Sequence, residues 1–343
     1  MNDTLYFPAE WERQSMVQLT WPHAATDWAS CLDDITETFL QLAELITRYE
    51  QLLIVTPNIQ DTRQQLSEHL TEGALSRVKF CECPTNDTWA RDHGALTLRN
   101  HTTGDIHLLN FRFNAWGCKF EARLDNAINT YLDRAGILHA PMTSHDDFVL
   151  EGGAVESDGC GTVFTTSQCL LAPNRNQPLT QFGIQTQLLR RLHAQRIVWL
   201  DHGHLIGDDT DGHIDTIVRC APDDTLLYVA CTDKEDEQYE DFQALEQQLK
   251  SLQTTDGRPY RLLPLPMPDA IHEDGEQLPA TYANFLVING AVIVPTYAQA
   301  EKDDLAAATI AQAFPDRDIL RIDARTIIRQ HGSVHCLTMQ YFK

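Results

Sequence analysis

The sequence has no cluster of lysine or arginine and no apolar run long enough to cross a membrane. Its 26 Lys and Arg residues are outnumbered by 49 Asp and Glu residues, which gives a formal net charge of −23 at pH 7. Such an acidic body excludes nucleic-acid binding through a basic patch and favours the approach of a cationic ligand. The longest apolar runs, at 52–55 and 285–288, are far shorter than a membrane span. We therefore expect neither a nucleic-acid partner nor a membrane partner.

Paired cysteines and an export signal are also lacking. The nine cysteines are odd in number and scattered, and no two of them form a C-x-x-C pair. This usage is typical of reduced cytosolic thiols and not of a disulfide framework. The first three residues are followed by no apolar segment, so we expect no secretory signal. Together these features predict a cytoplasmic protein.

No Pro-, Gly- or Ser-rich linker divides the chain. With 343 residues, of which 43% are hydrophobic and 22% charged, the composition is that of a globular protein with a large core. We expect one domain that spans residues 1–343.

A short pattern recurs about every sixty residues, and nearly every copy carries a residue suited to chemistry. The copies lie at residues 89–94, 151–153, 211–215, 284–290 and 331–336. Each copy leads into a β-prone run and a Gly- or Asp-rich turn. Recurrence at this period indicates a repeat architecture, in which each unit buries its apolar face against its neighbours.

Amphipathic helix candidates lie between these hairpins, and a short strand candidate follows each of them. Apolar residues at three- and four-residue spacing support the helices. The predicted helices are 33–49, 61–70, 123–134, 180–192, 237–252 and 303–314, and the strands after them are 52–56, 78–83, 137–139, 197–200, 261–266 and 319–323. The repeating unit is therefore strand–strand–helix–strand (ββαβ), and the fold class is α/β with five pseudo-repeats.

The last copy ends one strand short, at Lys343. Near the N-terminus, residues 16–21 supply a strand without a hairpin partner. Pairing these two segments would close the ring from both ends and hide sheet edges that otherwise invite aggregation.

Five residues stand at matching points of the repeats: Asp92, Glu151, His213, Asp215 and Cys336. Successive units would gather them around one axis. A catalytic thiol needs positive charge nearby to ionise, which a cationic substrate or a protonated histidine could supply. Histidine is suited to proton transfer near neutral pH. If a strand begins at His213, alternation points it and Asp215 to one face.

Simpler interpretations stay open for each residue alone. The Arg91-Asp92 pair could lie on the surface, and Glu151 with its glycines could form a turn. His202 and His204, with the segment 208–215, could bind zinc on composition alone. The segment 207–218 does not match a calcium loop, because Gly207 and Val218 stand where ligands are required.

The combination of three carboxylates, one histidine and one cysteine is more specific than any member. Carboxylates bind a planar guanidinium through paired N–H···O bonds. They keep the group charged and hold its central carbon still for attack by a thiolate. The sequence therefore predicts a site for a small cationic guanidine.

These residues and their surroundings resemble the agmatine deiminase branch of the guanidine-modifying, or pentein, enzymes, which is close to the bacterial peptidylarginine deiminases. The resemblance spans almost the whole chain. It rests on segments 8–12, 20–22, 86–92, 113–117, 150–153, 169–176, 208–215, 282–291 and 335–336. Two segments depart from the family's usual pattern, at 93–95 and 330–334.

The resemblance implies a five-bladed pseudo-symmetric α/β-propeller, no metal and no organic cofactor. It also implies a role for each site residue: Cys336 is the nucleophile, His213 the acid/base, Asp92 and Asp215 the guanidinium clamps, and Glu151 a residue that holds the guanidinium and orients His213. Trp89 would line the pocket, and Trp116 and Asp209 are candidates for contacting the distal amine of the substrate.

We expect hydrolysis of agmatine to N-carbamoylputrescine and ammonia through a covalent thiouronium on Cys336, a step towards putrescine. The main alternative is deimination of protein arginine. Deimination of free arginine would require a cation for the α-carboxylate, and Arg112 and Arg175 are the candidates. A zinc hydrolase and a non-enzymatic polyamine-binding protein are alternatives from other classes. The oligomeric state stays open, with a homo-oligomer as one option.

Overall fold

Five sheets share one arrangement of strands in the computed structural model, which describes residues 5–343. In each sheet one strand pairs antiparallel with a second, and the second pairs parallel with a third that follows a helix. The predicted ββαβ unit is therefore confirmed. Four of the units are continuous in sequence. The first consists of β5 (Leu96–Asn100), β6 (Ile106–Arg112), α6 (Ile128–Arg134) and β7 (Met142–Val149), and the second of β8 (Glu156–Ser157), β9 (Thr162–Thr166), α8 (Gln181–Arg191) and β10 (Arg196–Leu200). The third consists of β11 (Val218–Ala221), β12 (Thr225–Ala230), α9 (Tyr239–Ser251) and β13 (Arg261–Pro266), and the fourth of β16 (Leu286–Ile288), β17 (Ala291–Thr296), α10 (Ala300–Ala313) and β18 (Asp318–Asp323).

The two ends of the chain build the fifth sheet together. Strand β19 (Thr338–Phe342) pairs antiparallel with β2 (Gln14–Thr20), which pairs parallel with β3 (Gln51–Thr56) after α1 (Leu32–Thr47). The prediction that an N-terminal strand completes the last unit is confirmed. Strand β4 (Val78–Glu82) extends this sheet beside β3, and β1 (Leu5–Tyr6) extends the sheet of β5.

Shorter elements connect these units. They are the helices α2 (Ile59–His69), α3 (Glu72–Leu75), α4 (Ala90–His93), α5 (Ala115–Cys118) and α7 (Ser167–Leu170), the hairpin of β14 (Ile271–Glu273) and β15 (Glu276–Leu278), and the 3₁₀ turns η1 (Asp27–Cys31), η2 (Asp125–Ala127), η3 (Gly152–Ala154), η4 (Ile214–Thr216) and η5 (Ile327–Gln330).

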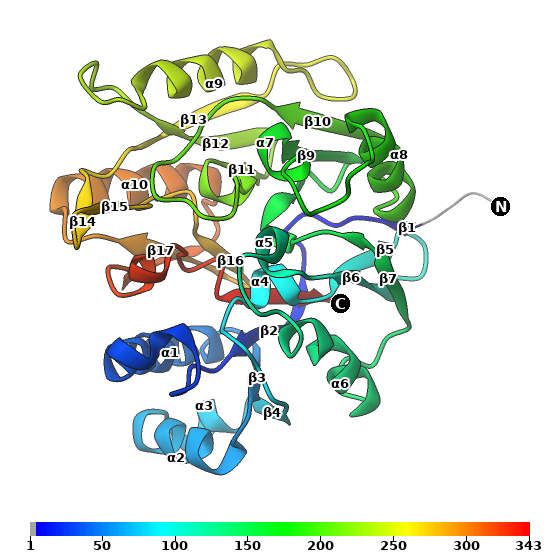
Figure 1. The fold of residues 1–343 in the computed structure, drawn as a ribbon, viewed down its shortest axis with the longest axis vertical. Coiled ribbons are helices and arrows are strands. Elements are labelled where there is room, and N and C mark those ends of the chain that lie inside the picture. Colours follow the sequence, from blue (N-terminus) through cyan, green and yellow to red (C-terminus); the bar gives the residue numbers. More distant parts are fainter. Residues whose placement is uncertain (1–4) are drawn as a thin grey trace.

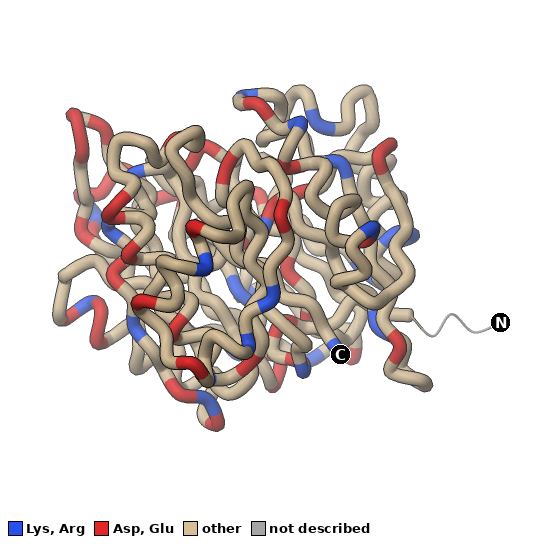
Figure 2. Tube along the Cα trace, turned by 90° about the horizontal axis from the view of Figure 1, so that it is seen from below, with Lys and Arg blue, Asp and Glu red and all other residues tan. Residues whose placement is uncertain are grey.

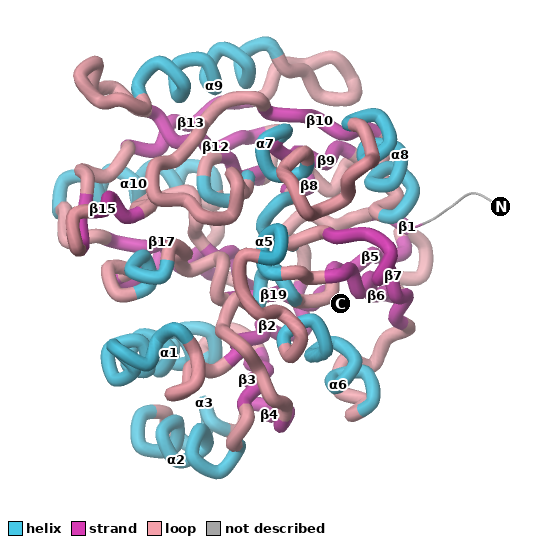
Figure 3. The backbone as a smooth tube through the Cα atoms, in the orientation of Figure 1, coloured by secondary structure: helices cyan, strands magenta, loops and turns pink. Residues whose placement is uncertain are grey.

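The helices of the five units lie at the periphery, and the strands lie inward of them (Figures 1 and 3). The short helices α4 and α5 lie near the middle of the view in Figure 1. Within the described residues, no helix is long and apolar enough to cross a membrane. Asp and Glu occur along much of the chain trace, with Lys and Arg interspersed among them (Figure 2).

Helix α1 illustrates how the apolar pattern produces this arrangement. Its buried residues Ile35, Phe39, Leu42 and Ile46 recur at three- and four-residue spacing, so they share one face. That face packs against β3 and β18. Fully burying one such side chain contributes about 1.5–3 kcal/mol to stability.

Two sequence predictions about local structure are wrong. Residues 137–139 form no strand, because Gly136 adopts a left-handed φ of 64° and Ile137 donates its N–H to the Leu132 carbonyl at 3.1 Å. Both features end α6, and the strand begins only at Met142. No strand begins at His213 either, since residues 214–216 form the 3₁₀ turn η4 and β11 begins at Val218.

Candidate active site

A short helical turn precedes the first strand of the unit at several of the recurring motifs, and these turns carry the predicted site residues. Asp92 lies on α4, and Glu151 directly precedes η3. His213 directly precedes η4, and Asp215 lies within it. Cys336 lies in the turn before β19. The motif that recurs in the sequence is therefore this turn together with the strand after it.

The backbone of Gly153 lies at the centre of three of these side chains. A Cβ atom built on Gly153 would lie 2.5 Å from His213 Nδ1, 3.0 Å from Asp92 Oδ1 and 3.1 Å from Asp215 Oδ2. No larger residue fits this position without displacing the histidine. The structure thus brings Asp92, His213 and Asp215 together, as the repeat predicted.

Asp92 is buried and held by two donors. Trp116 Nε1 donates to its Oδ2 at 2.9 Å, and the Gly153 N–H donates to its Oδ1 at 3.1 Å. Burial raises the pKa of Asp92 although His213, 3.6 Å from Oδ1, opposes the shift. A cationic group that enters beside Asp92 would favour its ionised form.

The loop that carries Trp116 has an unusual backbone. Ala115, Trp116 and Cys118 have φ values of 50°, 54° and 67°, in the left-handed region that non-glycine residues rarely adopt. The Asn114 side chain stabilises the turn by accepting the Gly117 N–H at 3.1 Å. Backbone strain of this kind is concentrated at functional sites, and here it directs the indole of Trp116 onto Asp92.

His213 is fully buried, and neither of its ring nitrogens has a hydrogen-bond partner among the described residues. Burial by itself lowers the pKa of His213, but Asp92, Cys169 and Asp215 outweigh it and the pKa lies well above its usual value. The surrounding groups thus favour the protonated imidazole, which can act as a proton donor.

Glu151 is also fully buried, and it faces Arg175. The Arg175 Nε donates to the two Glu151 carboxylate oxygens at 3.0 and 3.4 Å, and Arg175 Nη1 reaches Asp211 at 2.6 Å. Glu151 therefore belongs to an ion pair, and Arg175 is already engaged by two carboxylates.

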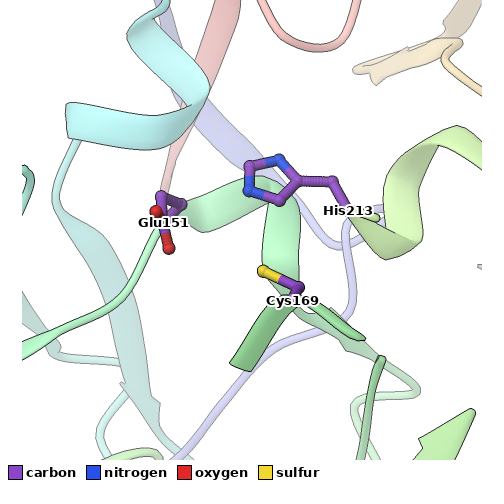
Figure 4. Close-up of side chains that lie close together, drawn as sticks. All are labelled: Glu151, Cys169 and His213. Carbon is purple, nitrogen blue, oxygen red and sulfur yellow. The ribbon is translucent and has the colours of Figure 1, made fainter. Parts of the chain in front are cut away.

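Glu151, Cys169 and His213 point toward one another, and their potential ligand atoms lie within 4.8 Å of each other (Figure 4). By atom type and distance these three side chains could hold a metal ion. The guanidinium of Arg175 is already paired with the Glu151 carboxylate, and its positive charge opposes the binding of a metal cation by these three side chains.

Asp215 is buried and bound on one side only. Its Oδ2 accepts from His335 Nδ1 at 2.7 Å, whereas its Oδ1 has no hydrogen-bond partner among the described residues. Burial acts to raise the pKa of Asp215, but His335 and His213 reverse the shift and the pKa lies below its usual value. Asp215 is thus an ionised carboxylate with a free oxygen.

Cys336 Sγ lies 4.0 Å from Asp215 Oδ2 and 3.3 Å from the side-chain oxygen of Asn284. That oxygen also accepts the N–H groups of Cys336 and His335 at 3.2 and 2.9 Å. Burial raises the pKa of the Cys336 thiol well above its usual value, and Asp215 and Asp92 raise it further. Burial and the two carboxylates thus favour the thiol, and added positive charge nearby would favour the thiolate.

A pocket opens above Cys336 and Asp92. Its wall combines aromatic rings with carboxylates, and none of its lining side chains within residues 5–343 is lysine or arginine. The lining residues are Asp27, Asp87, Trp89, Asp92, Trp116, Phe120, Asp209, Thr210, Gln330, His331, Gly332 and Cys336.

Trp89 forms one wall of this pocket. Its Nε1 donates to Asp87 Oδ2 at 3.1 Å, and its ring lies edge-on to Trp116 at 6.5 Å between centroids. A Cβ atom on Gly332 would lie 2.1 Å from the Trp89 ring, so only glycine lets the indole lie here.

Two carboxyl groups of the pocket have raised pKa values. Burial, with the neighbouring Asp27, raises the pKa of Asp87 to about 7. Burial, with Asp208, raises the pKa of Asp209 to about 6. A cationic ligand would stabilise the ionised form of both groups.

The structure divides the predicted residues between two positions. Trp89, Asp92, Trp116, Asp209 and Cys336 line the pocket, whereas Glu151, His213 and Asp215 are buried behind its floor. Trp116 donates to Asp92, the predicted guanidinium clamp, and also lines the pocket.

Other residues carry the alternative hypotheses: two arginines for binding the carboxylate of free arginine, and two histidines for binding zinc. Arg112 is exposed, and Arg175 is paired with Glu151 and Asp211. His202 faces Asp241 at 3.1 Å, and His204 faces Gln168 at 3.0 Å.

The sequence did not predict the observed contacts of four residues that the structure places at the site. They are Asn284 beside Cys336, Arg175 on Glu151, Cys169 beside His213, and Asp87 in the pocket wall. Asn284 had a signal, since it opens the fourth copy of the recurring motif. The other three depend on contacts that sequence spacing does not reveal.

Comparison with known proteins agrees with this geometry. A family model for Porphyromonas-type peptidyl-arginine deiminases matches residues 6–341. A putative agmatine deiminase of Vibrio parahaemolyticus is 33% identical, over 99% of this chain and 97% of that protein.

Two solved structures resemble the whole chain. A putative arginine deiminase from Porphyromonas gingivalis has a TM-score of 0.93 at 45% identity, covering 99% of this chain and 98% of that one. A Cys-to-Ser variant of a C. jejuni agmatine deiminase with substrate bound has a TM-score of 0.91 at 35% identity, covering 99% and 96%. The chain belongs to the Porphyromonas-type peptidyl-arginine deiminase family.

Proposed function

We propose that this enzyme hydrolyses agmatine to N-carbamoylputrescine and ammonia. The observation that carries the proposal is a buried carboxylate oxygen without a hydrogen-bond partner, beside a cysteine at the floor of an acidic pocket. Among the described residues Oδ1 of Asp215 has no partner, and Cys336 lies next to the other oxygen of Asp215. A buried polar atom without a partner costs about 1–3 kcal/mol, and a bound guanidinium would supply the positive charge and the N–H donor that this oxygen lacks.

The charges at the floor fit a guanidinium. In the proposed complex Asp92 and Asp215 accept its N–H groups, and Glu151, paired with Arg175, lies behind them beside His213. Positive charge beside Cys336 lowers the pKa of the thiol, because it offsets the two carboxylates that raise it. Binding of the substrate thus generates the thiolate that attacks it, and the thiol proton passes to solvent.

His213 then serves both halves of the reaction. The thiolate of Cys336 attacks the guanidinium carbon, and the imidazolium of His213 donates a proton to the nitrogen that leaves as ammonia. This step leaves a thiouronium on Cys336 and a neutral imidazole. The imidazole removes a proton from water, the hydroxide attacks the same carbon, and the C–S bond breaks to release the ureido product.

The pocket wall favours agmatine over arginine and peptidyl-arginine. Four lining carboxyl groups, those of Asp27, Asp87, Asp92 and Asp209, face a substrate with positive charge at both ends. The α-carboxylate of arginine would meet these acids without a lysine or arginine in the described lining, and Arg175 is already paired. Desolvation and like-charge repulsion then act against arginine.

Two broader properties are part of the same proposal. We infer that the five ββαβ units are the blades of a five-bladed α/β-propeller that forms one catalytic domain over 1–343, supported by the shared strand order and by the joining of both chain ends in one sheet. All nine cysteines are free, which supports a reducing, cytoplasmic setting for a step in putrescine biosynthesis.

The test is an ammonia-release assay with agmatine, free arginine and a peptidyl-arginine at one pH and ionic strength. We expect kcat/KM for agmatine to exceed that for arginine by about tens- to hundreds-fold, because about 1.4 kcal/mol corresponds to each factor of ten. Equal or better turnover of arginine or the peptide would overturn the agmatine assignment and leave deimination standing. Absence of ammonia from all three would favour a polyamine-binding protein, and loss of activity on chelation would favour a zinc hydrolase.

A further inference from the structure

His335 lies directly before the nucleophile but faces away from the pocket. Its side chain is buried, and it borders a separate cavity that contains Glu10, Glu156 and Gln340. It does not line the pocket that contains Cys336. Both of its ring nitrogens have partners, Nδ1 in Asp215 and Nε2 in Glu10 and Arg219, so neither is free to exchange protons with a substrate at the guanidinium carbon.

The imidazole of His335 connects Asp215 to a group of buried charges. Its Nδ1 lies 2.7 Å from Asp215 Oδ2, and its Nε2 lies 3.1 Å from both Glu10 Oε2 and Arg219 Nη2. We call Glu10, Glu156 and Arg219 the ionic cluster. They come from the N-terminal segment, β8 and β11, so three distant parts of the chain meet behind the site.

The ionic cluster is fully paired. Arg219 donates to both Glu10 and Glu156 and to the Ala283 carbonyl at 3.0 Å. Glu156 also accepts the Cys220 N–H at 3.1 Å. Glu10 accepts the side-chain amide of Gln340 and the Val287 N–H. These bonds leave the cluster little freedom to move and make it a firm support for the His335 ring.

The partners of His335 place a donor on Asp215. Asp215 Oδ2 lies 2.7 Å from Nδ1, and a carboxylate oxygen can only accept, so Nδ1 carries the proton of this hydrogen bond. On the other side of the ring, Arg219 can only donate to Nε2 and the Glu10 carboxylate can only accept from it.

We propose that His335 is a positioning residue, which binds one oxygen of Asp215 and so presents the other, ionised and unpaired, to the substrate guanidinium. The inference rests on the proposed deiminase function. His335 Nδ1 bonds to Oδ2 of the Asp215 carboxylate, so Oδ1 remains the acceptor without a hydrogen-bond partner among the described residues. Without that donor, burial would favour the protonated or rotated carboxyl group.

Two neutral amides at position 335 separate positioning from packing. His335→Asn places an amide N–H where Nδ1 lies and can still donate to Asp215. His335→Gln carries its amide farther out, towards Glu10 and Arg219, and does not supply the bond to Asp215. His335→Ala removes both contacts and serves as the reference for total loss.

We expect His335→Gln and His335→Ala to lower kcat/KM for agmatine by about 10- to 100-fold, largely through KM, because a hydrogen bond to a charged group is lost. His335→Asn should recover at least about tenfold of that loss. Thermal unfolding of each variant, followed by circular dichroism, ensures that only folded protein is compared.

A second measurement does not depend on the substrate. Iodoacetamide alkylates the thiolate form of Cys336. The rate of this alkylation, followed by peptide mass spectrometry as a function of pH, therefore reports how readily the thiol ionises. The groups that face Asp215 and this thiol are His335, His213 and Asp92, while Glu10 and Arg219 face His335. When Asp215 loses its donor and takes up a proton, it no longer opposes thiolate formation, so the alkylation midpoint should move to lower pH in His335→Gln and stay near wild type in His335→Asn.

The proposal is overturned if folded His335→Gln keeps the wild-type kcat/KM and alkylation midpoint, or if His335→Asn falls as far as His335→Gln in both. If wild-type protein releases no ammonia from agmatine, the proposed function fails, and the alkylation profile alone then decides whether His335 positions Asp215.

Discussion

Two buried charged regions meet at His335, and they differ in how their polar atoms are paired. The ionic cluster of Glu10, Glu156 and Arg219 is bonded throughout. The pocket floor leaves both nitrogens of His213 and one oxygen of Asp215 without partners. Burial and charge are common to both regions, so neither property marks a reactive site. The unpaired atoms beside Cys336 distinguish the pocket floor from the ionic cluster, because a bound ligand could complete them.

The comparison predicts that changes at the floor act on turnover and changes in the ionic cluster act on stability. The expected effects below decrease from the loss of the nucleophile to a shift of the pH profile.

Cys336→Ala should have the largest effect, a loss of at least about 10⁴-fold in kcat, because a nucleophile contributes several orders of magnitude. Removing one sulfur atom should leave the fold intact, which the thermal unfolding midpoint checks. Cys160→Ala is the control, because Cys160 is exposed and should retain full activity. A near-normal rate in Cys336→Ala would assign the chemistry to another group.

Asp92→Asn and Asp215→Asn should each raise KM and lower kcat. Removing one charge from a buried charged pair with the substrate costs about 2–5 kcal/mol, which corresponds to about 30-fold or more in kcat/KM. Asp316→Asn, at an exposed carboxylate, is the matched control in steady-state assays. Unchanged kinetics in either floor variant would show that its carboxylate does not touch the substrate.

Gly153→Ala should lower kcat/KM by about 100-fold, because displacing a catalytic group by about 1 Å has an effect of this size. The added methyl would lie 2.5 Å from His213 Nδ1, so the ring must move. The control is Gly73→Ala, where an added Cβ meets nothing within 4 Å. Equal activity of the two variants would mean that the position of His213 is not critical.

Glu156→Gln should affect stability more than turnover, the reverse of what is expected for the variants at the pocket floor. It leaves Arg219 with Glu10 as its remaining charged partner in the ionic cluster, so the free energy of unfolding should fall by about 3 kcal/mol in urea titrations. Turnover by the folded fraction should change by less than about tenfold. A variant with native stability and a large loss of turnover would contradict the division between the two regions.

The smallest effect concerns pH. The carboxyl groups of Asp87 and Asp209 have raised pKa values of about 7 and about 6, so each is neutral below its pKa and charged above it. The KM for agmatine should therefore rise as pH falls from about 8 to about 5. Asp87→Asn should remove the upper part of this dependence in a KM profile against pH. A KM that is flat over this range would exclude both groups from binding the substrate.

The sequence by itself determined the repeat, because apolar spacing in helices and strands is local. It placed the six main helices close to their observed bounds and predicted the reactive residues through their motifs and through a family resemblance. It could not place strand β7, since the left-handed Gly136 and the cap of α6 are properties of backbone geometry.

Only the tertiary structure decided which charged residues are free and which are paired. Arg175 could have received the carboxylate of arginine, but it is bound to Glu151 and Asp211. His335 could have been the acid/base, but Glu10 contacts it from 325 residues away and its ring faces Asp215. The reactivity of a buried group depends on its solvation and on the charges around it, and those neighbours come from distant segments that only the folded chain brings together.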